Sequence, residues 1–200
     1  MGARVNRSCG YHLTVDYPEA IETPTKIRSL FNLIHASEPF IYAILPPSRR
    51  SNGYARPIPP ERLRMLHGCR TLRSFERALA NWERNRGLNL THLFSPSPRI
   101  EFRYHSGSLD AVKCRHWLRL INRLVEHSIT RNCQASNRSV TPTVAEFDNW
   151  LMTIGLRSHS GIYRKISPEL RETAKYIRRR FKKFAAISSA GADSSQEGEE

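Results

Sequence analysis

The segment Arg99–His105 alternates without a break between polar and apolar side chains, and this period constrains the fold more than any other feature. Its apolar row consists of Ile100, Phe102 and Tyr104, and its polar row consists of Arg99, Glu101, Arg103 and His105. The alternation predicts a β-strand with one face on a core and a carboxylate between two guanidinium groups on the other. Such a row is either a salt-bridged sheet surface or a surface that holds a metal and phosphates.

A second segment, Gly10–Asp16, has the same period. Its apolar row consists of Tyr11, Leu13 and Val15, and its polar row consists of His12, Thr14 and Asp16. Two strands of this kind predict an α+β fold, in which an antiparallel sheet is backed by helices and leaves a polar face open. His12 and Glu101 would then belong to one site on that face.

The first half of the chain predicts helices around these strands. Thr25 can begin a helix that runs to about Leu45, with a kink or a break at Pro39. Residues 46–60 carry five prolines and three arginines and are expected to form a basic loop. Residues 60–86 have the apolar spacing of one or two helices, and residues 88–94 predict a short strand that forms a loose hairpin with the Arg99 strand.

The second half contains three helix signals. Ser108 is expected to cap a helix that reaches about Arg131. The sequence from Thr143 to Glu146 is a capping box, and its helix should stop at Gly155. Ser167 and Pro168 are expected to begin the last helix, and residues 188–200 to form a disordered acidic tail.

Length and composition narrow the class of protein. The 200 residues suffice for one large domain or two small ones. The sequence has neither an apolar run of membrane-spanning length nor a secretory signal. Its four cysteines are scattered and lack the spacing of a zinc site. These features together predict a cytoplasmic protein with reduced cysteines. The formal net charge of +14 predicts a polyanionic partner, either a nucleic acid or a nucleotide triphosphate.

Three motifs resemble those of the amidoligase family, which comprises carboxylate–amine ligases related to glutamine synthetases. Ser8-Cys-Gly-Tyr-His12 resembles the family's Cys-Gly-x-His-x-His strand, and Ser48-Arg-Arg-Ser-Asn-Gly-Tyr54 resembles the Arg/Asn/Tyr loop that follows it. Arg99-Ile-Glu-Phe-Arg-Tyr-His-Ser-Gly-Ser108 resembles its Glu-Phe-Arg strand, which leads into a long helix. The match covers about residues 5–186 in the family's order, so residues 1–187 are expected to form a partial amidoligase-like domain.

The resemblance implies a glutamine-synthetase-like fold with a curved antiparallel sheet around an active-site funnel. It implies a reaction in which ATP, with Mg, phosphorylates a small-molecule or peptide carboxylate, after which an amine attacks the acyl phosphate. His12 and Glu101 would be metal ligands, and Arg103 would hold phosphate beside Glu101 at the catalytic centre. The residues expected to bind nucleotide or substrate are Arg50, Asn52, Tyr54 and Arg99.

The sequence departs from the family pattern at two places. The family begins with a Glu-x-Glu strand that supplies further metal carboxylates, and no such strand precedes His12 here; Thr14 also replaces the second histidine of the motif. The chain is therefore expected to be an inactive fragment, one part of a split enzyme whose missing strand comes from a separate chain, or the product of a misassigned start.

Other functions have weaker support. A basic nucleic-acid-binding protein is the main alternative, because the last helix ends in Arg178-Arg-Arg-Phe-Lys-Lys183, yet no zinc finger, RNA-recognition motif or helix-turn-helix is evident. A serine hydrolase would need a Gly-x-Ser-x-Gly elbow, which is absent. A Walker-type phosphate loop is absent as well.

Overall fold

The two alternating segments both form strands and pair directly with each other. In the computed structural model, β1 (Gly10–Asp16) pairs antiparallel with β3 (Arg99–Ser106), and β3 pairs antiparallel with β2 (Leu88–Asn89). The sheet order is β1-β3-β2, so β1 lies at one edge. The structure describes residues 2, 4–6, 8–50, 53–135, 142–158 and 166–193, with the side chains of the last range described as far as residue 184.

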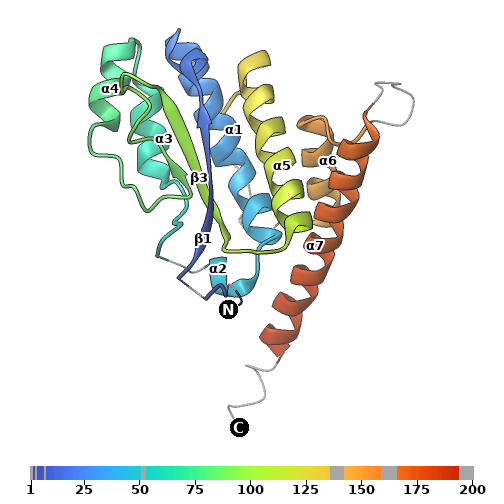
Figure 1. Cartoon of the computed structure of the whole chain (residues 1–200). Coiled ribbons are helices and arrows are strands. Elements are labelled where there is room, and N and C mark those ends of the chain that lie inside the picture. Colours follow the sequence, from blue (N-terminus) through green and yellow to red (C-terminus); the bar gives the residue numbers. More distant parts are fainter. Residues whose placement is uncertain are drawn as a thin grey trace.

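The other regular elements of the described chain are helices. They are η1 (Pro18–Ile21, a 3-10 turn), α1 (Pro24–Ala43), α2 (Pro47–Arg50), α3 (Pro60–His67), α4 (Leu72–Leu79), α5 (Ala111–Thr130), α6 (Val144–Thr153) and α7 (Pro168–Asp193). In Figure 1, β1 crosses in front of α1, α5 stands on the other side of α1 from β3, and α6 and α7 lie on the far side of α5. The α+β class predicted from the sequence is confirmed.

The core lies between the back of the sheet and the helices. Ile100, Phe102 and Tyr104 of β3 are fully buried there, in one cluster with the apolar faces of α1 and α5. The apolar row of β1 packs less tightly against the same cluster. The helices thus cover one face of the sheet and leave the polar face open, as the alternation predicted.

A β-bulge interrupts the pairing of β1 with β3. Leu13 lies opposite Phe102 and Tyr11 lies opposite His105, so Arg103 and Tyr104 together face His12. Beyond the bulge the alternation of β3 changes phase. His105, which the unbroken pattern placed on the polar face, is therefore buried on the core side, where its ring lies 5.1 Å from that of Trp117.

Several local predictions are confirmed. The capping box of Thr143 and Glu146 is formed at the start of α6, and Gly155 after its end has a φ of 74°. α7 begins at Pro168, and Ser167 accepts a hydrogen bond from the backbone of Leu170. Residues 60–86 form two helices, and β2 and β3 form the predicted hairpin.

Other predictions of helix limits were wrong. α1 continues as one helix through Pro39, so the break predicted there is wrong and the alternative of a kink stays a prediction; Phe40 after the proline makes ring contacts with Phe147 and Trp150 of α6. Asp110, rather than Ser108, caps α5, since its carboxylate accepts two backbone hydrogen bonds of the first turn.

Three further limits differ from the sequence prediction. Thr23, rather than Thr25, caps α1, because its hydroxyl accepts a hydrogen bond from the backbone N–H of Lys26. The basic loop contains one helical turn, α2. α7 continues to Asp193, into the segment predicted as an acidic tail; the remainder of that tail lies outside the described residues, and its disorder stays a prediction. No helix among the described residues has both the length and the apolar character needed to cross a membrane.

Candidate active site

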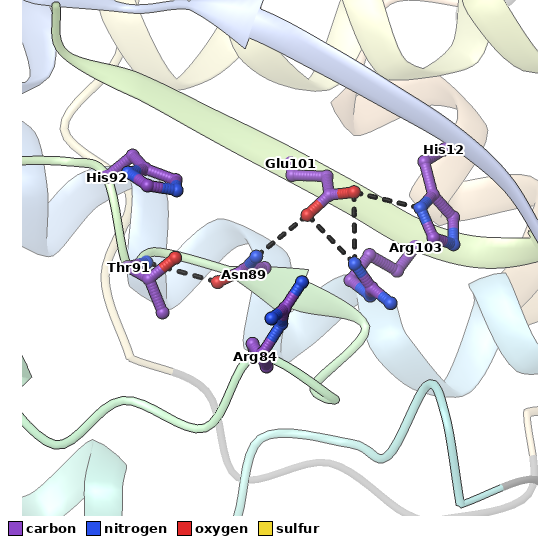
Figure 2. A pocket seen from close by; sticks show the side chains of 7 residues that line it. All are labelled: His12, Arg84, Asn89, Thr91, His92, Glu101 and Arg103. Carbon is purple, nitrogen blue, oxygen red and sulfur yellow. Dashed lines mark hydrogen bonds and ion pairs between the residues drawn. The ribbon is translucent and has the colours of Figure 1, made fainter.

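Glu101 is the centre of a hydrogen-bonded cluster on the open face of the sheet. Its Oε1 lies 2.9 Å from Nδ1 of His12, which projects from β1. Nη1 of Arg103, two residues along β3, lies 3.1 Å from both carboxylate oxygens. Nδ2 of Asn89 on β2 donates to Oε2 at 2.7 Å. All three strands therefore contribute to the contacts of one carboxylate (Figure 2).

The partners of Glu101 are themselves oriented by local structure. Oδ1 of Asn89 accepts a hydrogen bond from the backbone N–H of Thr91, which turns the amide nitrogen toward Glu101. Because an ionised carboxylate only accepts hydrogen bonds, His12 must donate from Nδ1 and carry its other lone pair on Nε2. The ring folds closely over Gly10, where a Cβ atom would lie 2.4 Å from Nε2.

This cluster forms the floor of a pocket of about 550 Å³. The residues that line it are His12, Arg84, Asn89, Thr91, His92, Glu101 and Arg103. In Figure 2, Arg84 approaches from the loop before β2 and lies on the side of Asn89 away from the β3 ribbon. Within the described residues, the guanidinium group of Arg84 forms no hydrogen bond or ion pair, so it can contact a ligand without breaking a contact of its own.

The electrostatics of the site favour a charged Glu101 and a neutral His12. Burial would raise the pKa of Glu101, but hydrogen bonds from Asn89 and Arg103 outweigh it and lower the pKa below its ordinary value. Burial and the nearby charge of Arg103 lower the pKa of His12. Among the described residues, Glu101 is the single acid that lines the pocket, against the two arginines Arg84 and Arg103, so the pocket attracts anions.

The donor set does not fit a divalent metal ion held by this chain alone. Mg²⁺ prefers several oxygen ligands, yet both oxygens of Glu101 already accept hydrogen bonds, and both are in contact with the cation Arg103. Among the described residues, no group of three or more His, Cys, Asp or Glu side chains could hold a metal. The assignment of His12 and Glu101 as metal ligands remains a prediction that this arrangement does not favour, although the two side chains do share the pocket.

The other predicted site residues lie away from this cluster. Arg50 donates to backbone carbonyl groups at the end of α1, at Tyr42, Ala43 and Leu45. Tyr54 is 62% exposed. Asn52 lies outside the described residues.

Arg99, the fourth residue expected to bind nucleotide or substrate, lies opposite Asp16 at the far end of the β1–β3 pair. Its Nη1 donates to the backbone of Ser97. None of these predicted roles in nucleotide or substrate binding is tested by the structure, and Arg50, Tyr54 and Arg99 do not line the pocket.

Three residues that sequence reasoning missed support the site. Arg84 and Asn89 line the pocket, and only the fold of the hairpin shows that they approach Glu101. Arg49 is 2% exposed and donates to the carbonyl groups of Tyr104 and Arg103 at 2.9 and 2.6 Å. It thereby holds the bulge of β3 that directs Arg103 to the open face. Its place within the predicted basic loop was the signal that could have found it.

The basic end of α7 is partly used within the fold. Arg178 makes a two-pronged contact with the carboxylate of Asp148, with both distances 2.8 Å. Arg180 donates to the carbonyl of Ile44 and lies over the ring of Phe184. The structure therefore offers no specific support for the nucleic-acid alternative.

Comparison with known sequences identifies the family of the chain. The sequence predicted an amidoligase-type site on the polar face of an antiparallel sheet. The structure has such an open face, with a cationic pocket beside the two motif strands. The sequence model of the family described as "Putative amidoligase enzyme" matches residues 1–125. The chain belongs to this family, and the match includes both motif strands and most of the long helix after them. Neither a curated protein nor a solved structure matches the chain.

Proposed function

We propose that this chain acts as an ATP-dependent carboxylate–amine ligase. The observation that carries the proposal is the cluster around Glu101 in an amidoligase-family chain, in which His12 and Arg103 come from the two motif strands and Asn89 from β2. The pocket above it carries more positive than negative side chains, which suits a triphosphate and a carboxylate substrate. A glutamine-synthetase-like curvature of the sheet, completed by a strand from a separate chain beside β1, is part of the same proposal.

In this reaction the γ-phosphoryl group of ATP moves to an oxygen of the substrate carboxylate, and ADP leaves. An amine then attacks the acyl phosphate to form an amide, and phosphate leaves. Arg103, held in a fixed position by Glu101, would bind phosphoryl oxygens on which charge develops. Arg84 would contact the same phosphate chain from the opposite wall of the pocket. His12 would stay oriented by Glu101 and present Nε2 to the ligand.

ATP binding provides a direct test. We expect ATP to raise the melting temperature of the wild-type chain, because a ligand that binds only the folded state stabilises it. Arg84→Gln should weaken ATP binding by about tenfold or more, since one charge-assisted hydrogen bond contributes about 1.5–3 kcal/mol. Thermal unfolding measures the first effect, and isothermal titration calorimetry measures the second.

The matched control for this test is Arg73→Gln, which removes the same charge from an exposed position of α4 outside the pocket. It should bind ATP as the wild type does. Equal losses in both variants would point to general attraction by the basic surface, and the absence of any ATP binding would remove the ligase proposal.

A further inference from the structure

We infer that the pocket binds the phosphate chain of its ligand directly through arginine side chains, with Glu101 as an internal counter-ion rather than a metal ligand. The inference rests on the proposed function only for the identity of the ligand as a triphosphate. It differs from the family expectation at one point, the role of the carboxylate. Three features of the described residues support it.

The first feature is the set of contacts that Glu101 already makes. A metal ion would have to replace the hydrogen bond from Asn89 at 2.7 Å or the contacts from Arg103 at 3.1 Å. The guanidinium group of Arg103 would also lie within contact distance of the same oxygens and repel the ion. Glu101 instead neutralises part of the charge of Arg103 and fixes its orientation, as a counter-ion does.

The second feature is that the described residues around the pocket include no second carboxylate. The residue opposite Glu101 on β1 is Thr14, whose hydroxyl is a weak metal ligand. Asp16, the only acid of β1, is paired in register with Arg99, two positions before Glu101 on β3. Among the described residues that line the pocket, Glu101 is the only acid. One carboxylate that is already paired with arginine cannot supply the oxygen ligands that Mg²⁺ requires.

The third feature is the surplus of cationic donors. Arg84 has no ion-pair partner among the described residues, and Nε of Arg103 is buried without a hydrogen-bond partner. A phosphate chain that enters the pocket would therefore exchange its water for several hydrogen-bond donors. Only at Arg103 would it compete with an existing contact within the protein.

The test compares tripolyphosphate with ATP, each titrated calorimetrically into the full chain in EDTA and again with excess Mg²⁺. We expect both ligands to bind in EDTA. Excess Mg²⁺ should weaken binding by about threefold to tenfold, because the ion neutralises charge on the phosphate chain that the arginines would otherwise contact. This comparison uses the wild-type chain and so does not depend on the folding of any variant.

Glu101→Gln separates the two roles of the carboxylate. If Glu101 is a counter-ion, its neutral isostere should bind tripolyphosphate in EDTA about threefold more tightly, because a negative charge beside the ligand is removed. Glu61→Gln, an equal change of charge at an exposed residue in the first turn of α3, should leave affinity unchanged. Thermal unfolding of both variants confirms that they are folded.

The outcomes separate this inference from the ligase proposal. ATP binding that requires Mg²⁺ and is lost in Glu101→Gln would overturn the inference and leave the ligase proposal standing. Binding of tripolyphosphate in EDTA without binding of ATP would support the inference and remove the ATP-dependent ligase. Failure of both ligands to bind under either condition would contradict both.

Discussion

Raising the pH from 4.5 to 8.5 should destabilise the wild-type chain more than its Glu38→Gln variant, by up to about 5 kcal/mol in the free energy of unfolding. Glu38 lies on α1 and is 4% exposed, and its carboxyl accepts hydrogen bonds from the hydroxyl of Tyr104 at 2.8 Å and the backbone N–H of Ile58 at 3.0 Å. Burial raises its pKa from 4.5 to about 8, against the opposing effect of these hydrogen bonds.

The direction of the effect follows from proton linkage. Between pH 4.5 and about 8 the folded chain keeps a proton on Glu38 that the unfolded chain has released. The stabilisation that this proton gives is fully present below pH 4.5 and is lost as the pH rises toward 8. Because one pKa unit corresponds to about 1.4 kcal/mol, the loss reaches about 5 kcal/mol at most. The glutamine side chain in the Glu38→Gln variant would keep an acceptor oxygen for these donors but would not titrate.

Urea unfolding at several pH values measures this effect. The difference between wild type and Glu38→Gln isolates Glu38, because other titrating groups, such as the buried His105, contribute equally to both chains. Parallel pH profiles of the two chains would show that Glu38 is ionised in the folded state or titrates normally. A profile in which the wild type gains stability relative to the variant at higher pH would reverse the predicted sign.

Gly87→Ala should cost about 3 kcal/mol of stability. A Cβ atom at this position would lie 2.0 Å from Cε1 of Tyr104, whose ring is fully buried. The backbone cannot move away easily, because it is hydrogen-bonded on both sides. The N–H of Gly87 donates to the backbone carbonyl of Arg56 at 2.8 Å, and its carbonyl accepts from the backbone N–H of Arg103 at 2.7 Å. Overpacking of a rigid core position typically costs about 1–3 kcal/mol, and this contact is at the upper end.

Chemical denaturation compares Gly87→Ala with Gly53→Ala, which serves as the control. Around Gly53 a Cβ atom would meet nothing within 4 Å, so its substitution should change stability by less than about 0.5 kcal/mol. Because the carbonyl of Gly87 also accepts the backbone hydrogen bond of Arg103, Gly87→Ala should weaken ATP binding as well. Equal stability of the two variants would show that the Tyr104 ring can move without cost.

Most of the correct predictions about the fold came from the two alternating segments, Gly10–Asp16 and Arg99–His105. The sheet pairing and the burial of Ile100 and Phe102 follow from a period of two, which requires only local sequence to recognise. The caps at Thr143 and Ser167 were also predictable, since a capping hydrogen bond joins residues only three positions apart. The proximity of His12 to Glu101 followed from pairing these two strands.

The sequence by itself determined the strands, most helices, the polar face and the family motifs, because each depends on residues close together along the chain. Only the tertiary structure decided which side chains complete the pocket. Arg49 contacts the β3 bulge from 54 and 55 residues away in sequence, and the bulge reverses His105 while keeping Glu101 and Arg103 on the open face. Arg84 and Asn89 reach the same pocket through the hairpin. Such long-range contacts leave no periodic pattern, since they depend on how separate elements pack.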